Sequence, residues 1–241
     1  MLKLIVSDFD GTLLPYGQNA LAPEVLGYIR AALDKNIAVA ISSGRTYGEL
    51  APYFCDVSDR LWFICADGAY YGRGGRFFYE KQIDRAELER FFKLRESGFA
   101  AIFHGAEKNY SIGNVPCASP LAERASKIGD VKEKIFKVTS FGGNIELPEY
   151  SALRKHWDGG ENKTAQFVNR FADKGAALSD LQVRLMITKF DTACLGDGGN
   201  DIAMMKNAKH AICIGNRSPE LSAVCSLHFD SAEKALIELL K

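Results

Sequence analysis

Three short apolar runs, far apart in the chain, are each followed at once by a polar segment. The runs are Leu4–Val6, Ile37–Ile41 and Thr192–Leu195, and each has the length and continuous hydrophobicity of a strand that is buried on both faces. The residues that follow them are rich in Asp, Ser and Gly. Since the loops at the carboxyl ends of the strands build the ligand site of an open parallel sheet, the pattern predicts an α/β fold in which polar residues from distant parts of the chain meet.

Helical patterns alternate with these strands near both ends of the chain. Pro23–Lys35 has apolar residues at helical spacing and a proline that suits a first helical turn, and Gly175–Met186 places three leucines on one face. The same reasoning predicts helices at Tyr47–Phe54, Asn200–Lys206, Pro219–Ala223 and Ala232–Leu240, strands at Leu61–Cys65, Ala211–Ile214 and Ser226–Phe229, and a hairpin over Tyr70–Tyr79. This alternation predicts a Rossmann-like parallel sheet with right-handed crossovers.

The pattern changes between residues 84 and 171. This stretch predicts helices at Arg85–Ser97, Ala118–Ile128 and Leu147–His156, and strands at Phe99–Phe103, Asn109–Ile112, Lys134–Ser140 and Gln166–Phe171. We expect an α+β domain with antiparallel pairing and an ordinary size for a small domain. The predicted organisation is therefore a core made of residues 1–83 and 172–241, with a second domain, residues 84–171, inserted between them.

The balance of charge excludes one class of partner. Thirty Lys and Arg residues offset thirty Asp and Glu residues, and no basic run points to nucleic acid or to an anionic membrane surface. No apolar run reaches the roughly 18–20 residues that span a bilayer, and the six cysteines contain no CxxC pair or metal-type spacing. We expect a soluble, cytoplasmic protein with reduced cysteines and no nucleic-acid or membrane partner, while the oligomeric state stays open.

Two pairs of aspartates give the strongest chemical signal. Asp8 and Asp10 are two residues apart, so their side chains share one face if the strand continues through both. Asp197 and Asp201 flank a Gly-Gly-Asn turn after another strand. Carboxylates that converge repel one another unless a hard cation lies among them, and Mg²⁺ is the candidate because it prefers oxygen ligands. One carboxylate of such a group can attack phosphorus while another transfers a proton.

Each of these segments, taken alone, has a simpler interpretation. Asp-x-Asp-Gly is also typical of a turn or a calcium loop, although the further oxygen ligands of a calcium loop are missing after Gly11. A glycine turn with a helix cap explains Asp197–Asp201, and Ser43 suits a strand end. A cation is needed to bind a phosphoryl group, and both Lys163 and Lys174 precede the returning helix; we favour Lys174, at the start of that helix.

The segments together resemble the haloacid dehalogenase (HAD) superfamily of phosphohydrolases, and in detail its Cof-type branch with a large α/β (C2-type) cap. Asp8–Leu13 is similar to the first family motif, Ser43–Arg45 to the second, Lys174–Leu178 to the third and Gly196–Met205 to the fourth. Ile214–Asn216 also resembles the C-terminal pattern of the family. The resemblance covers the core and implies a Rossmann-like HAD core with an inserted α+β cap domain.

The resemblance implies a Mg²⁺-dependent phosphatase that hydrolyses small phosphomonoesters, sugar phosphates among them, through an aspartyl-phosphate intermediate. In that reaction Asp8 would be the nucleophile and Asp10 the general acid and base. The implied site residues are Asp8, Asp10, Ser43 and Lys174 for catalysis, Gly44, Arg45 and Asn200 for substrate binding, and Asp8, Asp10, Asp197 and Asp201 for the metal, with Asp10 acting through its backbone carbonyl. The implied partner is a small phosphorylated metabolite.

One position departs from the family pattern, because Asp67 stands where relatives often have Asn and adds a negative charge near the site. The inserted domain has no motif that identifies a substrate, and we interpret its aromatic residues Phe103, Tyr110 and Phe141 as core.

The alternatives to a phosphatase are a phosphomutase or phosphotransferase on the same scaffold, and a non-catalytic binding protein. A nucleotide-binding Rossmann protein is disfavoured because no G-x-G-x-x-G follows the first strand.

Overall fold

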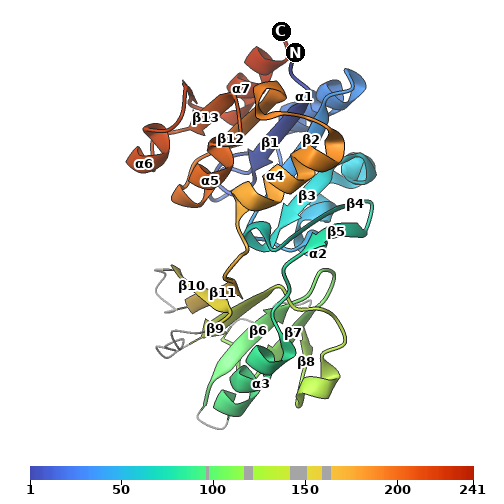
Figure 1. Ribbon diagram of the computed structural model, residues 1–241, viewed down its shortest axis with the longest axis vertical. Coiled ribbons are helices and arrows are strands. Elements are labelled where there is room, and N and C mark those ends of the chain that lie inside the picture. Colours follow the sequence, from blue (N-terminus) through green and yellow to red (C-terminus); the bar gives the residue numbers. More distant parts are fainter. Residues whose placement is uncertain (96–97, 117–121, 142–150, 159–163) are drawn as a thin grey trace. The chain divides into compact units, whose positions relative to one another are not determined.

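The computed structural model describes residues 1–95, 98–116, 122–141, 151–158 and 164–241. These residues form two compact units (Figure 1). The core unit consists of Met1–Arg45, Leu50–Tyr79 and Asp173–Lys241, and the insert unit consists of Thr46–Glu49 and the described residues within Glu80–Ala172. The short segment Thr46–Glu49, which the sequence analysis assigned to the core, thus groups with the insert unit.

An eight-stranded sheet runs through the core unit in the order β14-β13-β12-β1-β2-β3-β4-β5. Its strands are β1 (Leu4–Asp8), β2 (Ala38–Ser42), β3 (Trp62–Cys65), β4 (Tyr70–Arg73), β5 (Arg76–Glu80), β12 (Thr192–Gly196), β13 (His210–Ile214) and β14 (Leu227–Phe229). The strands from β14 to β3 are parallel to their neighbours, and β4 is antiparallel to β3. Because β1 lies between β12 and β2, the loops after these three strands meet at one edge of the sheet.

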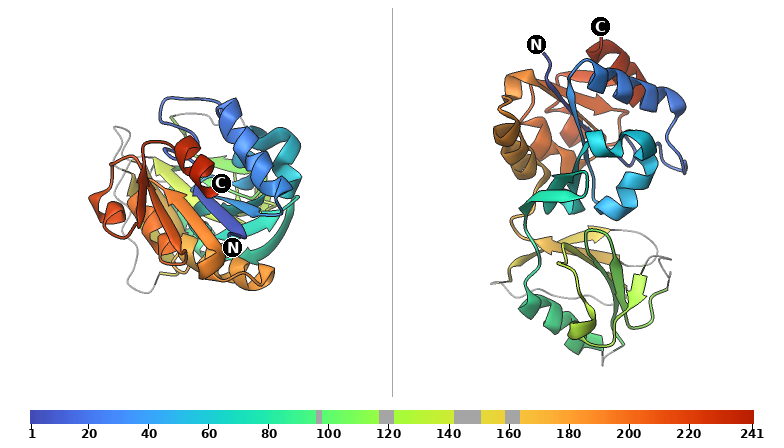
Figure 2. Two further views of the ribbon diagram at one scale, coloured as in Figure 1. Left: turned by 90° about the horizontal axis from the view of Figure 1, so that it is seen from above. Right: turned by 90° about the vertical axis from the view of Figure 1, so that its right-hand side faces the viewer.

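Helices cover both faces of this sheet (Figure 2). One face is covered by α4 (Lys174–Leu185) and α5 (Ile202–Met205), and the other by α1 (Pro23–Asp34) and α7 (Ala232–Leu239). Further helical segments are α2 (Tyr47–Leu50), α6 (Pro219–Ser222) and a 3-10 segment over Ala51–Arg60. Within the described ranges, none of the helices is long and apolar enough to cross a bilayer.

The alternation of side chains along β1 decides which face Asp8 joins. Leu4 and Val6 belong to one buried apolar cluster with Leu178 and Leu181 of α4. Since successive strand residues point to opposite faces, Asp8 lies on the same face as Leu4 and Val6. The last residue of the central strand is therefore directed to the side of the sheet on which α4 packs.

The insert unit is built on a six-stranded sheet in the order β10-β11-β9-β6-β7-β8. Its strands are β6 (Ala100–His104), β7 (Asn109–Ile112), β8 (Ala122–Arg124), β9 (Lys137–Phe141), β10 (Leu153–Asp158) and β11 (Thr164–Asn169), and all described pairs are antiparallel except β7 with β8. The helix α3 (Arg85–Leu94) packs on one face, where the ring centroid of Phe91 lies 6.1 Å from that of Phe103 and 5.2 Å from that of Phe167. Phe103 and Tyr110 are buried in this core, as predicted, whereas Phe141 is only half-buried at the end of β9 and does not belong to it.

The predicted fold class, an α/β Rossmann-like core with an inserted α+β domain, is confirmed. Two predicted helices of the insert are wrong where the structure describes them. Ala122–Arg124 forms the edge strand β8, and Leu153–Asp158 forms β10. Residues 118–121 and 147–150, where these helices were predicted to begin, lie outside the described residues. Both segments are rich in residues with good helix propensity, but backbone pairing with β7 and β11 outweighs these weak preferences.

Candidate active site

Three aspartates from the ends of two neighbouring strands form a buried cluster in the core unit. Asp8 is the last residue of β1, Asp197 directly follows β12, and Asp201 lies one turn further along the chain. The two strands are parallel and adjacent. One carboxylate oxygen from each aspartate lies within 4.8 Å of the others, and each residue is no more than 6% exposed.

Lys174 adds a buried positive charge to this cluster. Its Nζ atom lies 2.7 Å from Asp8 Oδ1 and 2.8 Å from Asp201 Oδ1, and its side chain is 1% exposed. The lysine is the first residue of α4, whose N-cap Asp173 accepts a hydrogen bond from a first-turn amide at 2.9 Å. This cap stabilises the start of the helix at the point from which the lysine reaches β1.

Three buried carboxylates face one buried ammonium group, and the exposed Arg217 is the other cation within 4 Å of them in the described structure, so negative charge remains in excess. Burial raises the pKa of Asp8 to about 7 against the lowering effect of Lys174, and Asp201 and Asp197 raise it as well. Burial and Asp201 also raise the pKa of Asp197. Although burial opposes it, pairing with Asp201 and Asp8 raises the pKa of Lys174, which stays protonated. A divalent cation would supply the missing positive charge, and carboxylate oxygens are the ligands that hard cations prefer, so these residues fit such a metal.

Asp197 is also contacted by residues that the sequence analysis did not single out. Its Oδ1 accepts a hydrogen bond from the Thr12 hydroxyl at 3.4 Å, and its Oδ2 accepts one from the Tyr16 hydroxyl at 3.2 Å. Arg217 Nη1 lies 3.7 Å from the same Oδ2, and Arg217 Cζ lies 4.0 Å from the centroid of the Tyr16 ring. Thr12 belongs to the first motif and could have been found there, whereas no sequence pattern marks Tyr16 or Arg217.

The Asp10 carboxylate forms an ion pair with Arg45. β1 ends at Asp8, so the condition under which both aspartates would share a strand face is not met. The carboxylate of Asp10 pairs instead with Arg45, whose Nε lies 2.9 Å from Oδ2 and whose Nη2 lies 2.6 Å from Oδ1. The backbone carbonyl of Asp10 accepts a hydrogen bond from the Tyr16 hydroxyl at 3.3 Å.

The loop after β2 presents Ser43, Gly44 and Arg45. Ser43 is 1% exposed, and its Oγ accepts a hydrogen bond from the Arg45 amide at 3.1 Å. Its carbonyl oxygen accepts one from the Asp67 amide at 3.1 Å. A Cβ atom on Gly44 would lie 3.2 Å from Asp67 Oδ2, so the extra carboxylate noted in the sequence lies directly beside this loop.

The structure thus brings together Asp8, Lys174, Asp197 and Asp201, and the Asp10–Arg45 pair follows β1 and β2 at the same edge of the sheet. Asn200 is exposed in the turn after β12, where its side-chain oxygen lies 2.8 Å from the position that a Cβ atom on Gly198 would take. Lys163, the alternative phosphoryl-binding lysine, lies outside the described residues.

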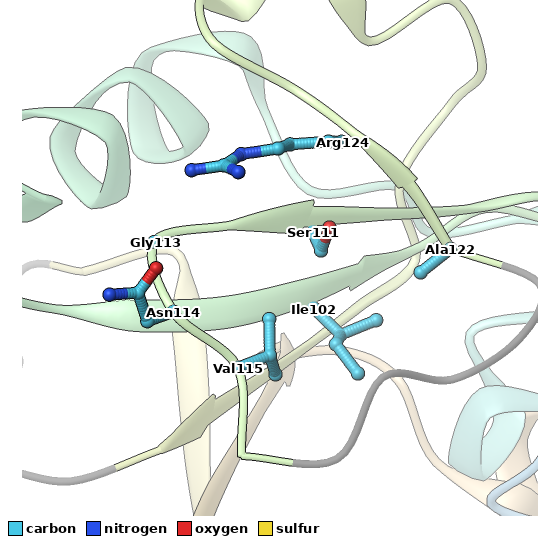
Figure 3. A pocket seen from close by; sticks show the side chains of 7 residues that line it. All are labelled: Ile102, Ser111, Gly113, Asn114, Val115, Ala122 and Arg124. Atoms are coloured by element: carbon cyan, nitrogen blue, oxygen red, sulfur yellow. The ribbon is translucent and has the colours of Figure 1, made fainter.

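A cavity of about 270 Å³ belongs to the insert unit (Figure 3). It is lined by Ile102, Ser111, Gly113, Asn114, Val115, Ala122 and Arg124. Among the described residues of this lining, Arg124 is the only charged one, and Asp, Glu, His and Cys are absent from them. The described lining therefore has none of the metal ligands or acid–base groups that the core unit gathers.

Comparison with known proteins identifies the family. A model of the haloacid dehalogenase-like hydrolase family matches residues 5–237. Phosphatase YwpJ of Bacillus subtilis (strain 168) is 23% identical over 269 residues, which cover 92% of this chain and 93% of YwpJ. The 5-amino-6-(5-phospho-D-ribitylamino)uracil phosphatase YcsE of the same organism is 26% identical over 220 residues, which cover 89% of this chain and 84% of YcsE.

Solved structures share the fold. The HAD subclass IIB sugar phosphatase BT4131 aligns with a TM-score of 0.78 and 19% sequence identity, over 98% of each chain. The family match spans nearly the whole sequence, including all four motifs. The chain belongs to the haloacid dehalogenase-like hydrolase family, in its Cof-type branch of phosphohydrolases.

Proposed function

We propose that this phosphoric monoester hydrolase uses Mg²⁺ and an aspartyl-phosphate intermediate to hydrolyse small phosphomonoesters, sugar phosphates among them. The main support is the buried cluster of Asp8, Asp197 and Asp201, in which Lys174 pairs with two of the three. Burying several carboxylates is unfavourable unless cations neutralise them. A cluster with surplus negative charge at the ends of the central strands suits a site that binds a metal ion and reacts with a phosphate ester.

In the proposed reaction an oxygen of the Asp8 carboxylate attacks phosphorus. A bond forms between this oxygen and phosphorus, the bond from phosphorus to the leaving-group oxygen breaks, and Asp10 donates a proton to that oxygen. A water molecule then attacks the phosphorus of the aspartyl phosphate and gives a proton to Asp10. The bond between Asp8 and phosphorus breaks, so inorganic phosphate leaves and both carboxyl groups return to their starting states.

Lys174 and Ser43 are suited to bind the transferring phosphoryl group. The Lys174 ammonium lies beside the attacking carboxylate, 2.7 Å from Asp8 Oδ1, where it would oppose the negative charge on the phosphoryl oxygens. The Ser43 hydroxyl accepts a hydrogen bond from the Arg45 amide and still has its own proton to donate. Asn200 would help to order the same pocket from the turn after β12.

Asp8, Asp197 and Asp201 would hold the metal ion, together with the backbone carbonyl of Asp10. A bound Mg²⁺ would neutralise charge on the phosphoryl oxygens and on the clustered carboxylates. Lys174 alone cannot do this, because it brings one positive charge to three carboxylates.

The insert unit is proposed as the cap, the domain that selects the substrate. Its sheet is covered by α3 on one face, and a row of cross-strand neighbours on the other face contains Ser111, Ile102, Thr139 and Gln166. Hydroxyl and amide side chains of this kind suit hydrogen bonds to a polyhydroxylated leaving group. The names of YcsE and BT4131 give a phosphorylated ribityl compound and sugar phosphates as substrates of those proteins, which supports small phosphorylated metabolites as the substrate class here.

The proposed function is tested by measuring phosphate release from a panel of phosphorylated metabolites, with Mg²⁺ and with EDTA, for the wild type and for Asp8→Asn. Release that needs Mg²⁺ and is lost in the variant would support it. Release that persists in Asp8→Asn would contradict the role of Asp8, and no release from any compound would favour a binding protein. Product analysis with a sugar bisphosphate separates hydrolysis from phosphoryl transfer to a sugar hydroxyl.

A further inference from the structure

The Asp10 carboxylate and the Arg45 guanidinium form a two-pronged ion pair in the core unit. Nε lies 2.9 Å from Oδ2 and Nη2 lies 2.6 Å from Oδ1, so both carboxylate oxygens are engaged. Two parallel bonds fix the plane of a carboxylate as well as its position. The side chains are 33% and 40% exposed for Arg45 and Asp10, and pairs with this exposure add little to stability. The effect of the pair is therefore mainly one of orientation.

Arg45 is itself held on several sides. Its Cζ lies 5.1 Å from the ring centroid of Phe9 and 5.4 Å from that of Tyr53, and its Nη1 donates a hydrogen bond to the Tyr53 hydroxyl at 3.2 Å. Its backbone amide donates to Ser43 Oγ at 3.1 Å. The two rings also contact each other, with centroids 4.9 Å apart, and a planar guanidinium that packs against such a pair has few alternative positions. Arg45 can therefore impose one orientation on the Asp10 carboxylate.

We propose that Arg45 is a positioning residue for the general acid and base Asp10, and not a residue that binds substrate. The inference rests on the proposed function, in which Asp10 moves a proton to and from the reacting oxygens. Such a transfer requires the carboxylate oxygen within hydrogen-bond reach of its partner. The Nε and Nη2 groups of Arg45 already bind Asp10 and its Nη1 binds Tyr53, so a phosphoryl group would have to compete with these contacts.

Substrates with different leaving groups distinguish a role of Arg45 in positioning Asp10 from a role in binding the phosphoryl group. The alkoxide of an alkyl or sugar phosphate needs a proton as its bond to phosphorus breaks, whereas p-nitrophenolate leaves without one. General acid catalysis contributes about 10²–10⁴-fold to rate. Loss of the Asp10 orientation should therefore lower kcat/KM for the alkyl substrate far more than for p-nitrophenyl phosphate. Loss of a phosphoryl-binding residue should lower kcat/KM for both substrates by the same factor.

The test compares Arg45→Met with the wild type on p-nitrophenyl phosphate and on the alkyl phosphate that is hydrolysed fastest in the metabolite panel. A misplaced catalytic group can cost about 100-fold in rate. We therefore expect kcat/KM for the alkyl phosphate, divided by kcat/KM for p-nitrophenyl phosphate, to be at least about tenfold lower in Arg45→Met than in the wild type. Arg45→Lys should recover little, because an ammonium group cannot form the two-pronged pair. In an Asp10→Asn background, Arg45→Met should change kcat/KM by less than about threefold, since Arg45 acts through Asp10.

Arg30 provides a matched control in the same unit. Its Nε and Nη2 atoms lie 3.1 and 3.0 Å from the two carboxylate oxygens of Asp56, so Arg30→Met removes an equivalent pair on the surface. That variant should leave both kcat/KM values unchanged. Equal losses on both substrates in Arg45→Met, or losses that add to those of Asp10→Asn, would overturn the proposal.

Crystal structures of the wild type and of Arg45→Met give a readout that does not depend on turnover. We expect one orientation of the Asp10 carboxylate in the wild type, paired with Arg45, and a different or a mixed orientation in the variant. An unchanged Asp10 in the variant would overturn the positioning role even if activity were lost. If the wild type released no phosphate from any compound, the proposed function would fail, while these two structures would still decide whether Arg45 orients Asp10.

Discussion

Lys174 Nζ lies 2.8 Å from Asp201 Oδ1, and Asp201 has no exposed surface. This pair joins the first residue of α4 to the turn after β12. The second oxygen of Asp201 accepts hydrogen bonds from the amides of Asp197 and Gly198 at 3.2 and 3.1 Å. Since buried carboxylates are stable only when they are paired and hydrogen-bonded, Asp201 fixes the lysine and the turn relative to each other within the core unit.

Replacing Lys174 with Met should therefore affect both stability and activity. Removing one partner of a buried ion pair typically costs about 3–5 kcal/mol, and we expect a loss of this size in urea unfolding. The rate of phosphate release should fall by about 10²–10³-fold, as for other groups that stabilise developing charge. Lys163→Ala is the comparison variant and should keep most of the activity. A larger loss of rate in Lys163→Ala than in Lys174→Met would contradict the assignment of Lys174 as the lysine that binds the phosphoryl group.

Gly11 and Gly17 have nearly the same backbone, with φ values of +87° and +84°, but different surroundings. A Cβ atom on Gly11 would lie 2.4 Å from Asp197 Oδ2 and 2.4 Å from Tyr16 Cε2, whereas nothing lies within 4 Å of a Cβ atom on Gly17. Alanine at either position should introduce backbone strain of about 1–2 kcal/mol. We expect Mg²⁺ to raise the melting temperature of the wild type and of Gly17→Ala. Only Gly11→Ala should also displace Asp197 and so lose this increase. Equal responses of the two variants to Mg²⁺ would contradict this.

The motifs explain why the centre of the site could be predicted from the sequence. Asp8, Lys174 and Asp197 each stand where a strand ends or a helix begins, and parallel strands bring such positions together. The partner of Arg45 could not be predicted, because it depends on β1 ending at Asp8 and on where the Asp10 carboxylate then points. Tyr16 reaches Asp197 from a loop whose path no local pattern fixes.

In the fold, too, some strands could be predicted from the sequence and others could not. The core strands could be predicted because strands buried on both faces are continuous apolar runs, as in β1 and β12. The strand β8 has three residues, Ala122–Arg124, and its formation depends on an edge position beside β7. In β10 the partner strand β11 decides the conformation of Leu153–Asp158. Pairing with a neighbouring strand leaves no periodic signal within segments this short and polar.

His104 makes the stability of the insert unit sensitive to acid. It is buried, with Nε2 2.9 Å from Thr139 Oγ1 and Nδ1 3.8 Å from Glu49 Oε1. Burial, with a contribution from Lys137, lowers the pKa of His104, against the effects of Glu49 and Asn109. The folded state therefore keeps the ring neutral while an unfolded histidine takes up a proton near about pH 6.5. The resulting stability is fully present above that pH and is lost as the pH falls, by up to about 1.4 kcal/mol per pH unit.

Urea unfolding at about pH 7.5 and about pH 5.5, on either side of the unfolded pKa of histidine, checks this. The wild type should lose more stability between the two conditions than His104→Gln does. His228→Gln, which changes an exposed histidine of the core unit, should behave as the wild type. An equal acid-induced loss in the wild type and in His104→Gln would show that His104 does not contribute.

Asp67 places a negative charge beside the loop that would receive the phosphoryl group. It adopts φ +56°, a left-handed conformation that Asn also tolerates, and its carboxylate lies next to Gly44. Asp67→Asn keeps the shape of the side chain and removes its charge, so we expect inorganic phosphate to inhibit the variant more strongly, by about threefold to tenfold at low salt. Asp59→Asn, on the exposed surface, should not change the inhibition constant. Weaker inhibition in Asp67→Asn would contradict the expected repulsion.

The most direct test of the account is whether Asp8 is phosphorylated during turnover. Asp10→Asn should slow hydrolysis of the intermediate but still react with p-nitrophenyl phosphate, which needs no proton donor for its leaving group. After mixing with Mg²⁺ and this substrate and quenching in acid, peptide mass spectrometry should find a phosphoryl group on the peptide that contains Asp8, and none in Asp8→Asn or with EDTA. Turnover by the wild type with phosphate on another residue, or with no protein-bound phosphate in Asp10→Asn, would contradict the account.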